Sequence, residues 1–419
     1  MDQNIYFPTV ADIEKASAKL EEIIEPTPYQ YNAHFSAKYG CNVFLKREDL
    51  QMVRSYKIRG AYNKISSIAP DVLRYGIVCA SAGNHAQGVA FSCNKLKILG
   101  SIYMPVTTPG QKIEAVNMFG KQYVDIVLTG DTFDEANEAA QKYAARCGKT
   151  FIPPFDDEKI IEGQGTIGYE IEHQAKDRPD FVFIPIGGGG LASGLGAYIK
   201  QVWPECKVIG VEPAGAASMK ASLEAGHVVD LEHINKFVDG AAVKKPGRLT
   251  YAICKEVLDD IIPVPEGAVC STIIEMYNKN ATVVEPAGAL SVAALRFCQD
   301  MIKGKNVACI ISGSNNDITR MEEIREQSLV YEGLKHYFLV NFPQRSGALL
   351  AFIRDIVGPS DNLVYIQYIK KTNKEEGPAL IGIEVAAKED YEALIRRMEA
   401  NGISYEYINQ NNKLFEMLI

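Results

Sequence analysis

Short apolar runs alternate with amphipathic stretches from about residue 75 onward, and this alternation limits the chain to few folds. An apolar run that ends at a turn and is followed by helical spacing is typical of a strand and then a helix. Strands separated by helices favour parallel sheets with right-handed crossovers, so we expect an α/β architecture with helices on both faces of the sheets. The expected strands are Ile77–Ala80, Gly100–Val106, Tyr123–Leu128, Phe181–Ile186, Lys207–Val211 and Asn306–Ile311.

The pattern changes after about residue 330 to the order βαββαβ, which predicts a ferredoxin-like α+β domain. We therefore expect a two-lobed region over residues 1–328, with a small lobe at about 55–150 inserted in the larger lobe, and a second domain over residues 329–419. The second domain's expected elements are strands Tyr337–Phe342, Leu363–Lys370, Ala379–Val385 and Ser404–Ile408 and helices Ser346–Val357 and Asp390–Ala400.

Composition excludes several classes of protein. Formal charge is 44 − 52 = −8 and is spread along the chain, which argues against nucleic acid as a partner. The nearly uncharged stretch 181–200 contains six glycines, which fits a strand, a loop and a helix better than a membrane span. Nine cysteines without a C-x-x-C pair indicate a reduced, cytoplasmic protein, and six scattered histidines give no zinc motif.

Lys57 is the first candidate for chemistry, because a lysine amine can form a Schiff base with a carbonyl compound. It lies at the expected start of a helix, with Ser55 as the predicted N-cap. We expect the positive helix end, together with Arg54 and Arg59, to lower the pKa of the Lys57 amine. The plain alternative is a solvated surface lysine.

Four consecutive glycines, Gly187–Gly190, follow the expected strand 181–186 and precede a helix. Residues without Cβ let a backbone close around a phosphate with its N–H groups inward. The run lacks the Gly-Lys-Ser/Thr ending of a nucleotide P-loop, and four unbroken glycines suit a compact phosphate better than a dinucleotide. Pyridoxal phosphate (PLP) carries both an aldehyde for Lys57 and a phosphate for this turn.

Two further turns follow expected strands. Ser81–His85 opens a helix and can present N–H groups to an anion such as a substrate carboxylate, although an ordinary β–α turn has the same pattern. Ser312–Asn316 ends the strand 306–311 at the carboxyl edge, where α/β ligands bind; alone it reads as a loop.

Together these segments resemble the fold-type II PLP enzymes, and specifically the threonine dehydratases. Residues 331–419 resemble a single copy of the ACT-like regulatory domain of the biosynthetic members. The motifs that carry the resemblance are Ser55–Ala61, Ser81–Gln87, Gly187–Gly190, Glu285–Ala289 and Ser312–Gly313.

The resemblance implies a role for each site residue. Lys57 would bind PLP covalently, Asn84 would hydrogen-bond its 3-oxygen, and Ser312 would face its pyridine nitrogen. The phosphate would be bound by Gly187, Gly188, Gly189, Gly190 and Leu191, with Gly240 and Glu285 also lining the cofactor. The substrate would be held by Ser81, Gly83, Asn84 and His85.

The implied reaction is the conversion of L-threonine to 2-oxobutanoate and ammonia, the first step of isoleucine biosynthesis, with Lys57 removing the α-proton. Ala82 stands where serine-racemising relatives carry a serine, which disfavours racemisation. Glu212 occupies a cation-site position, but a second acidic ligand of that site is replaced by Ser218. The alternatives are a serine dehydratase of the same fold and a catalytically silent amino-acid sensor.

The resemblance of the C-terminal domain implies that an amino-acid effector regulates the activity. The resemblance makes isoleucine the expected inhibitor and valine an expected activator, with Tyr368 at an effector-contacting position, in a homodimer or homotetramer. A plain oligomerisation domain is the alternative.

Overall fold

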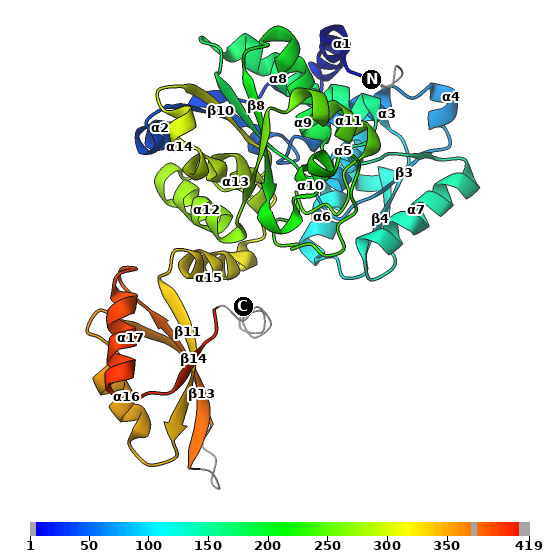
Figure 1. Cartoon of the computed structure of the whole chain (residues 1–419). Helices are drawn as coiled ribbons and strands as arrows, with labels where there is room; N and C mark the ends of the chain where they lie inside the picture. The colour runs from blue at the N-terminus through cyan, green and yellow to red at the C-terminus, as the bar shows by residue number, and fades with distance from the viewer. Residues whose placement is uncertain (1–5, 370–374, 410–419) are drawn as a thin grey trace. The chain divides into compact units, whose positions relative to one another are not determined.

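A computed structural model describes residues 6–369 and 375–409 of the chain (Figure 1). The chain forms two compact units, Met1–Asp317 and Ile318–Ile419. The domain boundary expected at residue 328 falls inside α15 (Met321–Tyr331), the first α-helix of the second unit. Within the described ranges, no helix is long and apolar enough to cross a membrane.

The larger sheet of the first unit has the order β1-β2-β10-β7-β8-β9. All neighbours pair in parallel except β1, which runs antiparallel to β2. Apolar residues of β7, β8 and β10 pack against α9 in one buried core. The strands are β1 (Tyr29–Tyr31), β2 (Asn42–Arg47), β7 (Phe181–Pro185), β8 (Lys207–Pro213), β9 (Asp260–Val264) and β10 (Asn306–Ile311).

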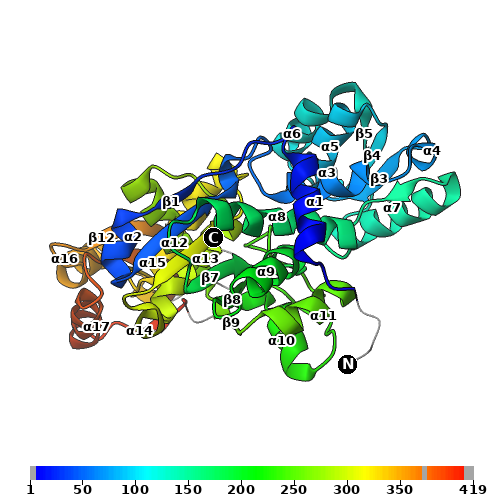
Figure 2. The ribbon, with the colours of Figure 1, turned by 90° about the horizontal axis from the view of Figure 1, so that it is seen from above.

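The smaller sheet is entirely parallel, in the order β5-β4-β3-β6, and has its own core. Figure 2 shows it with α3, α5 and α6 as one lobe, while β7–β9 with α9–α11 form the other. This small lobe agrees with the α/β alternation read from the sequence. Its strands are β3 (Ile77–Ala80), β4 (Gly100–Met104), β5 (Val124–Leu128) and β6 (Thr150–Phe151).

The helices α3 (Lys57–Ser66) and α8 (Glu158–Gln174) join the lobes. α3 packs against α5 (Asn84–Leu96) of the small lobe and against α8, and α8 packs against α9 of the other lobe. Glycines permit these close approaches: a Cβ on Gly163 would lie 2.6 Å from the Cα of Gly60. The other α-helices of this unit are α1 (Val10–Leu20), α2 (Ala33–Tyr39), α4 (Pro70–Leu73), α6 (Gly110–Gly120), α7 (Phe133–Cys147), α9 (Gly190–Val202), α10 (Ser218–Ala225), α11 (Arg248–Val257), α12 (Glu266–Asn280), α13 (Pro286–Ala293) and α14 (Gln299–Ile302).

The second unit has the predicted ferredoxin-like order after α15. Its antiparallel sheet runs β12-β13-β11-β14, and α16 and α17 pack on it through Phe352 and Leu394. Lys370, the expected end of one strand, lies outside the described residues. The elements are β11 (Lys335–Pro343), α16 (Ala348–Ile356), β12 (Asn362–Tyr368), β13 (Glu376–Glu384), α17 (Asp390–Ala400) and β14 (Tyr405–Tyr407).

Candidate functional site

The amine of Lys57 lies among buried groups at the start of α3. Its Nζ donates a hydrogen bond to the carbonyl oxygen of Pro154 at 2.9 Å. Burial lowers the pKa of the Lys57 amine to about 8, while the charge of Glu285 acts in the opposite direction. About a tenth of the amine is therefore neutral at pH 7, far more than for an ordinary lysine, and able to attack a carbonyl carbon.

Two expectations for the surroundings of Lys57 were wrong. Ser55 is not the N-cap: that position is Tyr56, and no side chain caps the helix. Ser55 is instead buried, with an Oγ that has no partner within the described residues, and it forms a bridge to Gly313. Burial, rather than nearby arginine charge, lowers the pKa of the Lys57 amine, because carboxylates neutralise Arg59.

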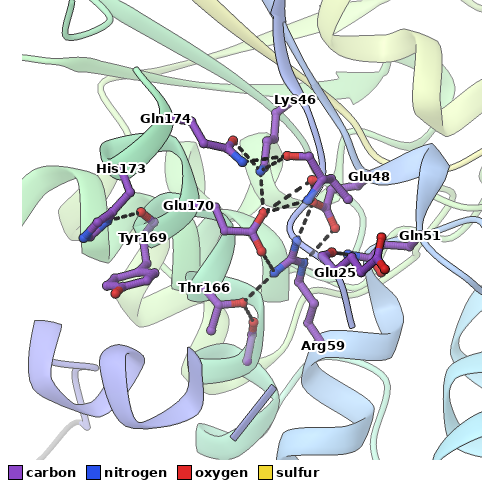
Figure 3. Close-up of polar contacts among 12 residues, drawn as sticks. Glu25, Lys46, Glu48, Gln51, Arg59, Thr166, Tyr169, Glu170, His173 and Gln174 are labelled. Atoms are coloured by element: carbon purple, nitrogen blue, oxygen red, sulfur yellow. Dashed lines mark hydrogen bonds and ion pairs between the residues drawn. The ribbon is translucent and has the colours of Figure 1, made fainter. Parts of the chain in front are cut away.

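Arg59 belongs to a buried ion network that fixes the first turn of α3 (Figure 3). Its guanidinium donates two bonds of 2.8 Å to Glu48 and one of 2.6 Å to Glu170 of α8. Glu170 also pairs with Lys46 of β2. The charges of two cations and two carboxylates therefore balance. Because Arg59 is two residues after Lys57, this network joins the start of α3 to β2 and α8.

The glycine run forms a tight turn between β7 and α9. Gly189 has a φ of +94°, a conformation that favours glycine, and a Cβ on Gly188 would lie 2.3 Å from the ring of Phe155. Among the described residues, the N–H groups of Gly188–Gly190 donate no backbone hydrogen bond. The side chain of Leu191 is buried in the core, so only its backbone is available to a phosphate.

The turn Ser81–His85 leads into α5, which begins at Asn84 with Gly83 as its N-cap. The hydroxyl of Ser81 accepts the N–H of Gly83 at 3.2 Å, leaving the first N–H groups of α5 for an anion. His85 is buried with its Nε2 3.0 Å from the carbonyl of Ile152, and burial lowers the pKa of its imidazole to about 3. The ring is therefore neutral, and His85 can serve a carboxylate only through its backbone.

The remaining predicted cofactor residues gather around Asn84. Its Nδ2 donates to Glu285 Oε1 at 2.7 Å, and burial raises the pKa of the Glu285 carboxyl to about 7. A Cβ on Gly240 would lie 3.3 Å from the same Oε1. Ser312 is buried, and its carbonyl accepts the N–H of Tyr56 at 3.2 Å, next to Lys57.

Two predicted residues have no contact with this group among the described residues. Tyr368 is in the second unit, with its ring 5.6 Å from that of Phe342. Glu212 is buried and accepts the N–H groups of Met219 and Lys220 at 2.8 and 2.9 Å, so its carboxylate stabilises the start of α10. Within the described residues, no three His, Cys, Asp or Glu side chains are grouped to hold a metal ion, so we assign none to Glu212.

The arrangement fits PLP. A reactive amine, an unpartnered buried hydroxyl at Ser55 and a glycine turn whose N–H groups donate no backbone hydrogen bond among the described residues lie at the carboxyl ends of the parallel strands.

Comparison with known proteins gives the family. Residues 20–313 match the pyridoxal-phosphate dependent enzymes, and residues 326–418 match the C-terminal regulatory domain of threonine dehydratase. The biosynthetic L-threonine dehydratase of Halalkalibacterium halodurans is 55% identical over 410 residues, which cover 98% of this chain and 99% of that protein. The chain belongs to the biosynthetic threonine dehydratases. Its cofactor is therefore pyridoxal phosphate.

Other members and solved structures agree with this family. The biosynthetic L-threonine dehydratase of Bacillus subtilis is 54% identical over 410 residues, 98% of this chain and 97% of that one. The processed form of threonine deaminase isoform 2 from Solanum lycopersicum superposes with a TM-score of 0.72 at 39% identity, covering 78% of this chain and 90% of that one. Maize serine racemase gives 0.71 at 28% identity, covering 78% and 99%.

Sequence reasoning missed several residues of this dehydratase site. Pro154 and Phe155 follow β6 and contact Lys57 and the glycine turn. Asn315 contacts Asn84. Their positions in the loops that follow the strands β6 and β10 were the available signal, because loops at that sheet edge carry ligand contacts.

Proposed function

We propose that this chain catalyses the PLP-dependent α,β-elimination of L-threonine to 2-oxobutanoate and ammonia, the first step of isoleucine biosynthesis. The observation that carries the proposal is the Lys57 amine, whose pKa is about 8 and which donates to Pro154, the residue before Phe155 at the glycine turn. The names of relatives that are 54–55% identical over nearly the whole chain support the same substrate.

The chain's own groups divide the work. Bound PLP supplies an electron-accepting ring that stabilises negative charge at the substrate α-carbon. Lys57 acts as the base that removes the α-proton, and the first N–H groups of α5 hold the substrate carboxylate. With PLP bound, Ser312 would offer the ring nitrogen a neutral hydroxyl, which would favour loss of the β-hydroxyl over storage of charge. The water lost in that step is regained when the product hydrolyses to the 2-oxo acid and ammonia.

L-Serine is a second substrate of the same site. It differs from threonine by one methyl group, and an apolar pocket discriminates one methyl by only about 1–3 kcal/mol. Racemisation of serine is not expected, because Ala82 has no proton to donate on the opposite face of the α-carbon.

The test is the release of 2-oxo acid and ammonia from L-threonine and L-serine by the PLP-loaded chain. Equal amounts of 2-oxobutanoate and ammonia, with kcat/KM higher for threonine, would support the proposal. A higher kcat/KM for serine would make the chain a serine dehydratase, and formation of D-serine would overturn the argument from Ala82.

Isoleucine is the proposed inhibitor and valine the proposed activator, acting on the second unit. This unit contains a cavity of about 280 Å³ with the apolar rings of Phe342 and Phe352 on its wall. Arg345 lines it as well, together with the carboxylates of Asp355 and Glu376. An amino acid with an apolar side chain offers the matching carboxylate, ammonium and alkyl groups. Tyr368 packs against Phe342 and remains a predicted effector contact.

We also propose that the chain forms a homodimer or homotetramer and that it is cytoplasmic. Val364, Tyr365 and Ile366 of the edge strand β12 are 36%, 38% and 41% exposed, which is apolar surface that a second copy could cover. Seven of the nine cysteines are buried, as is typical of unmodified thiols in a reducing compartment. Light scattering of the purified chain measures the oligomeric state directly.

A further inference from the structure

The side-chain amide of Asn84 is held at both ends. Its Nδ2 donates to Glu285 Oε1 at 2.7 Å, and its Oδ1 accepts the Nδ2 of Asn315 at 2.6 Å. The backbone N–H of Asn315 also bonds to Glu285. Asn84, Asn315 and Glu285 therefore form a closed triangle of hydrogen bonds.

A backbone carbonyl fixes the direction of these bonds. The Nδ2 of Asn315 also donates to the carbonyl oxygen of Val53 at 2.9 Å. A carbonyl oxygen can only accept, so the side-chain atom of Asn315 that faces Val53 must be its nitrogen. The same nitrogen then faces Asn84, which must turn its oxygen toward Asn315 and its NH₂ group toward Glu285.

The loop that carries Asn315 is itself anchored. The backbone N–H of Ser314 donates to the carbonyl of Arg54 at 2.9 Å, and its hydroxyl donates to the carbonyl of Asp49 at 3.1 Å. The side chain of Asn315 is thus fixed relative to residues 49–54, which lead directly into Lys57.

We propose that Asn315 is a positioning residue that locks the amide of Asn84 with its NH₂ group available to the 3-oxygen of the cofactor. An amide NH₂ has two hydrogens, and Glu285 takes one of them. Asn315 occupies the amide oxygen and so, together with Glu285, keeps the second hydrogen available to the cofactor. Without Asn315 the amide can rotate by half a turn and present an oxygen to the cofactor oxygen.

This proposal rests on PLP binding at the site, and its test reads the cofactor rather than turnover. The 3-oxygen belongs to the chromophore, so a lost hydrogen bond changes the ratio of the long- to the short-wavelength absorbance band of bound cofactor. Asn315→Asp keeps the size of the side chain but removes both donors, and Asn315→Leu removes them without adding charge. We expect each variant to bind PLP with this ratio changed by about fivefold, as the loss of one hydrogen bond implies.

Asn306→Asp is the matched control. Asn306 lies at the other end of β10, donates its amide nitrogen to the carbonyl of Arg178 and accepts from Asn42. This control should leave the absorbance ratio unchanged. A changed ratio in Asn306→Asp would mean that general loosening of the strand, and not loss of the Asn315 contact, causes the effect in the Asn315 variants.

A double-mutant cycle separates positioning from stability. Asn84→Ala should change the ratio like the Asn315 variants, and Asn84→Ala combined with Asn315→Leu should add nothing further. Additive changes, or an unchanged spectrum in both Asn315 variants, would overturn the proposal. Failure of the unaltered chain to bind PLP would instead refute the proposed function.

Discussion

At the scale of single residues, the surroundings of Lys57 set its chemistry. Protein around the amine disfavours its charged form, and Glu285 only partly offsets this. The nearby imidazole of His85 is neutral and adds no positive charge. The pH at which the amine becomes nucleophilic is therefore a direct readout of the site.

The rate at which cofactor-free protein captures PLP should rise with pH through a midpoint near 8, not near the ordinary 10.5 of lysine. The sign follows because the neutral amine, which attacks the aldehyde, predominates above its pKa. Stopped-flow absorbance measures the rate. Glu285→Gln removes the carboxyl whose pKa is about 7 and should keep a rising profile; a pH-independent rate in the unaltered protein would contradict the account.

Gly188 tests the phosphate turn. Gly188→Ala places a Cβ 2.3 Å from the ring of Phe155, so the turn must open. Overpacking typically costs about 1–3 kcal/mol, and we expect the Kd for PLP to rise by about tenfold or more. Gly110→Ala is the control, because a Cβ there meets nothing within 4 Å. Equal PLP affinity in the two variants would argue against the turn as the phosphate site.

At the scale of elements, the ion network around Arg59 holds α3 against β2 and α8. Arg59 is 1% exposed, so removing it leaves Glu48 and Glu170 as buried charges without their main partner. We expect Arg59→Met to lower the free energy of unfolding by about 3–5 kcal/mol. Urea denaturation measures this, with Arg146→Met on exposed α7 as the control. Adding Glu48→Gln to Arg59→Met should restore part of the loss; no loss in Arg59→Met would refute the role of the network.

The sequence predicted elements better than it predicted contacts. β3 and β10 have the expected ends because their signals are local. The assignments of Ser55 as a cap and of the arginines as the cause of the Lys57 pKa shift failed for the opposite reason. Both depend on packing between segments far apart in the chain, such as Ser55 with Gly313 and Arg59 with Glu170.

For the candidate site as well, local motifs were easier to predict than contacts between distant segments. Lys57 and the glycine run stand out in the sequence by their motifs, whereas the Ser312 segment alone reads as a loop and its role is implied only by the resemblance. Pro154 contributes only a backbone carbonyl to Lys57, and Asn315 contributes an amide whose partners come from residues 53 and 84. The strands that precede these loops place them at the ligand-binding edge of the sheets, but no local pattern identifies the distant partners of Pro154 and Asn315.

At the scale of the whole molecule, we propose that an effector bound to the second unit changes the affinity of the first unit for substrate. Isoleucine that binds more tightly to the less active state must raise the threonine concentration needed for half-maximal rate, commonly by about 5–150-fold. Arg345→Ala should abolish this shift while the rate without isoleucine is unchanged, because Arg345 lines the cavity of the second unit. Threonine saturation curves with and without isoleucine provide the measurement. An isoleucine shift that survives Arg345→Ala would move the effector site elsewhere.

The most direct test of the account is 2-oxobutanoate release from L-threonine by the PLP-loaded chain and its Lys57→Ala variant, with Lys95→Ala on the exposed surface of α5 as the control. We predict turnover in the unaltered chain and in Lys95→Ala, and none above background in Lys57→Ala. Turnover by Lys57→Ala close to that of the unaltered chain would contradict the central claim that this amine performs the chemistry.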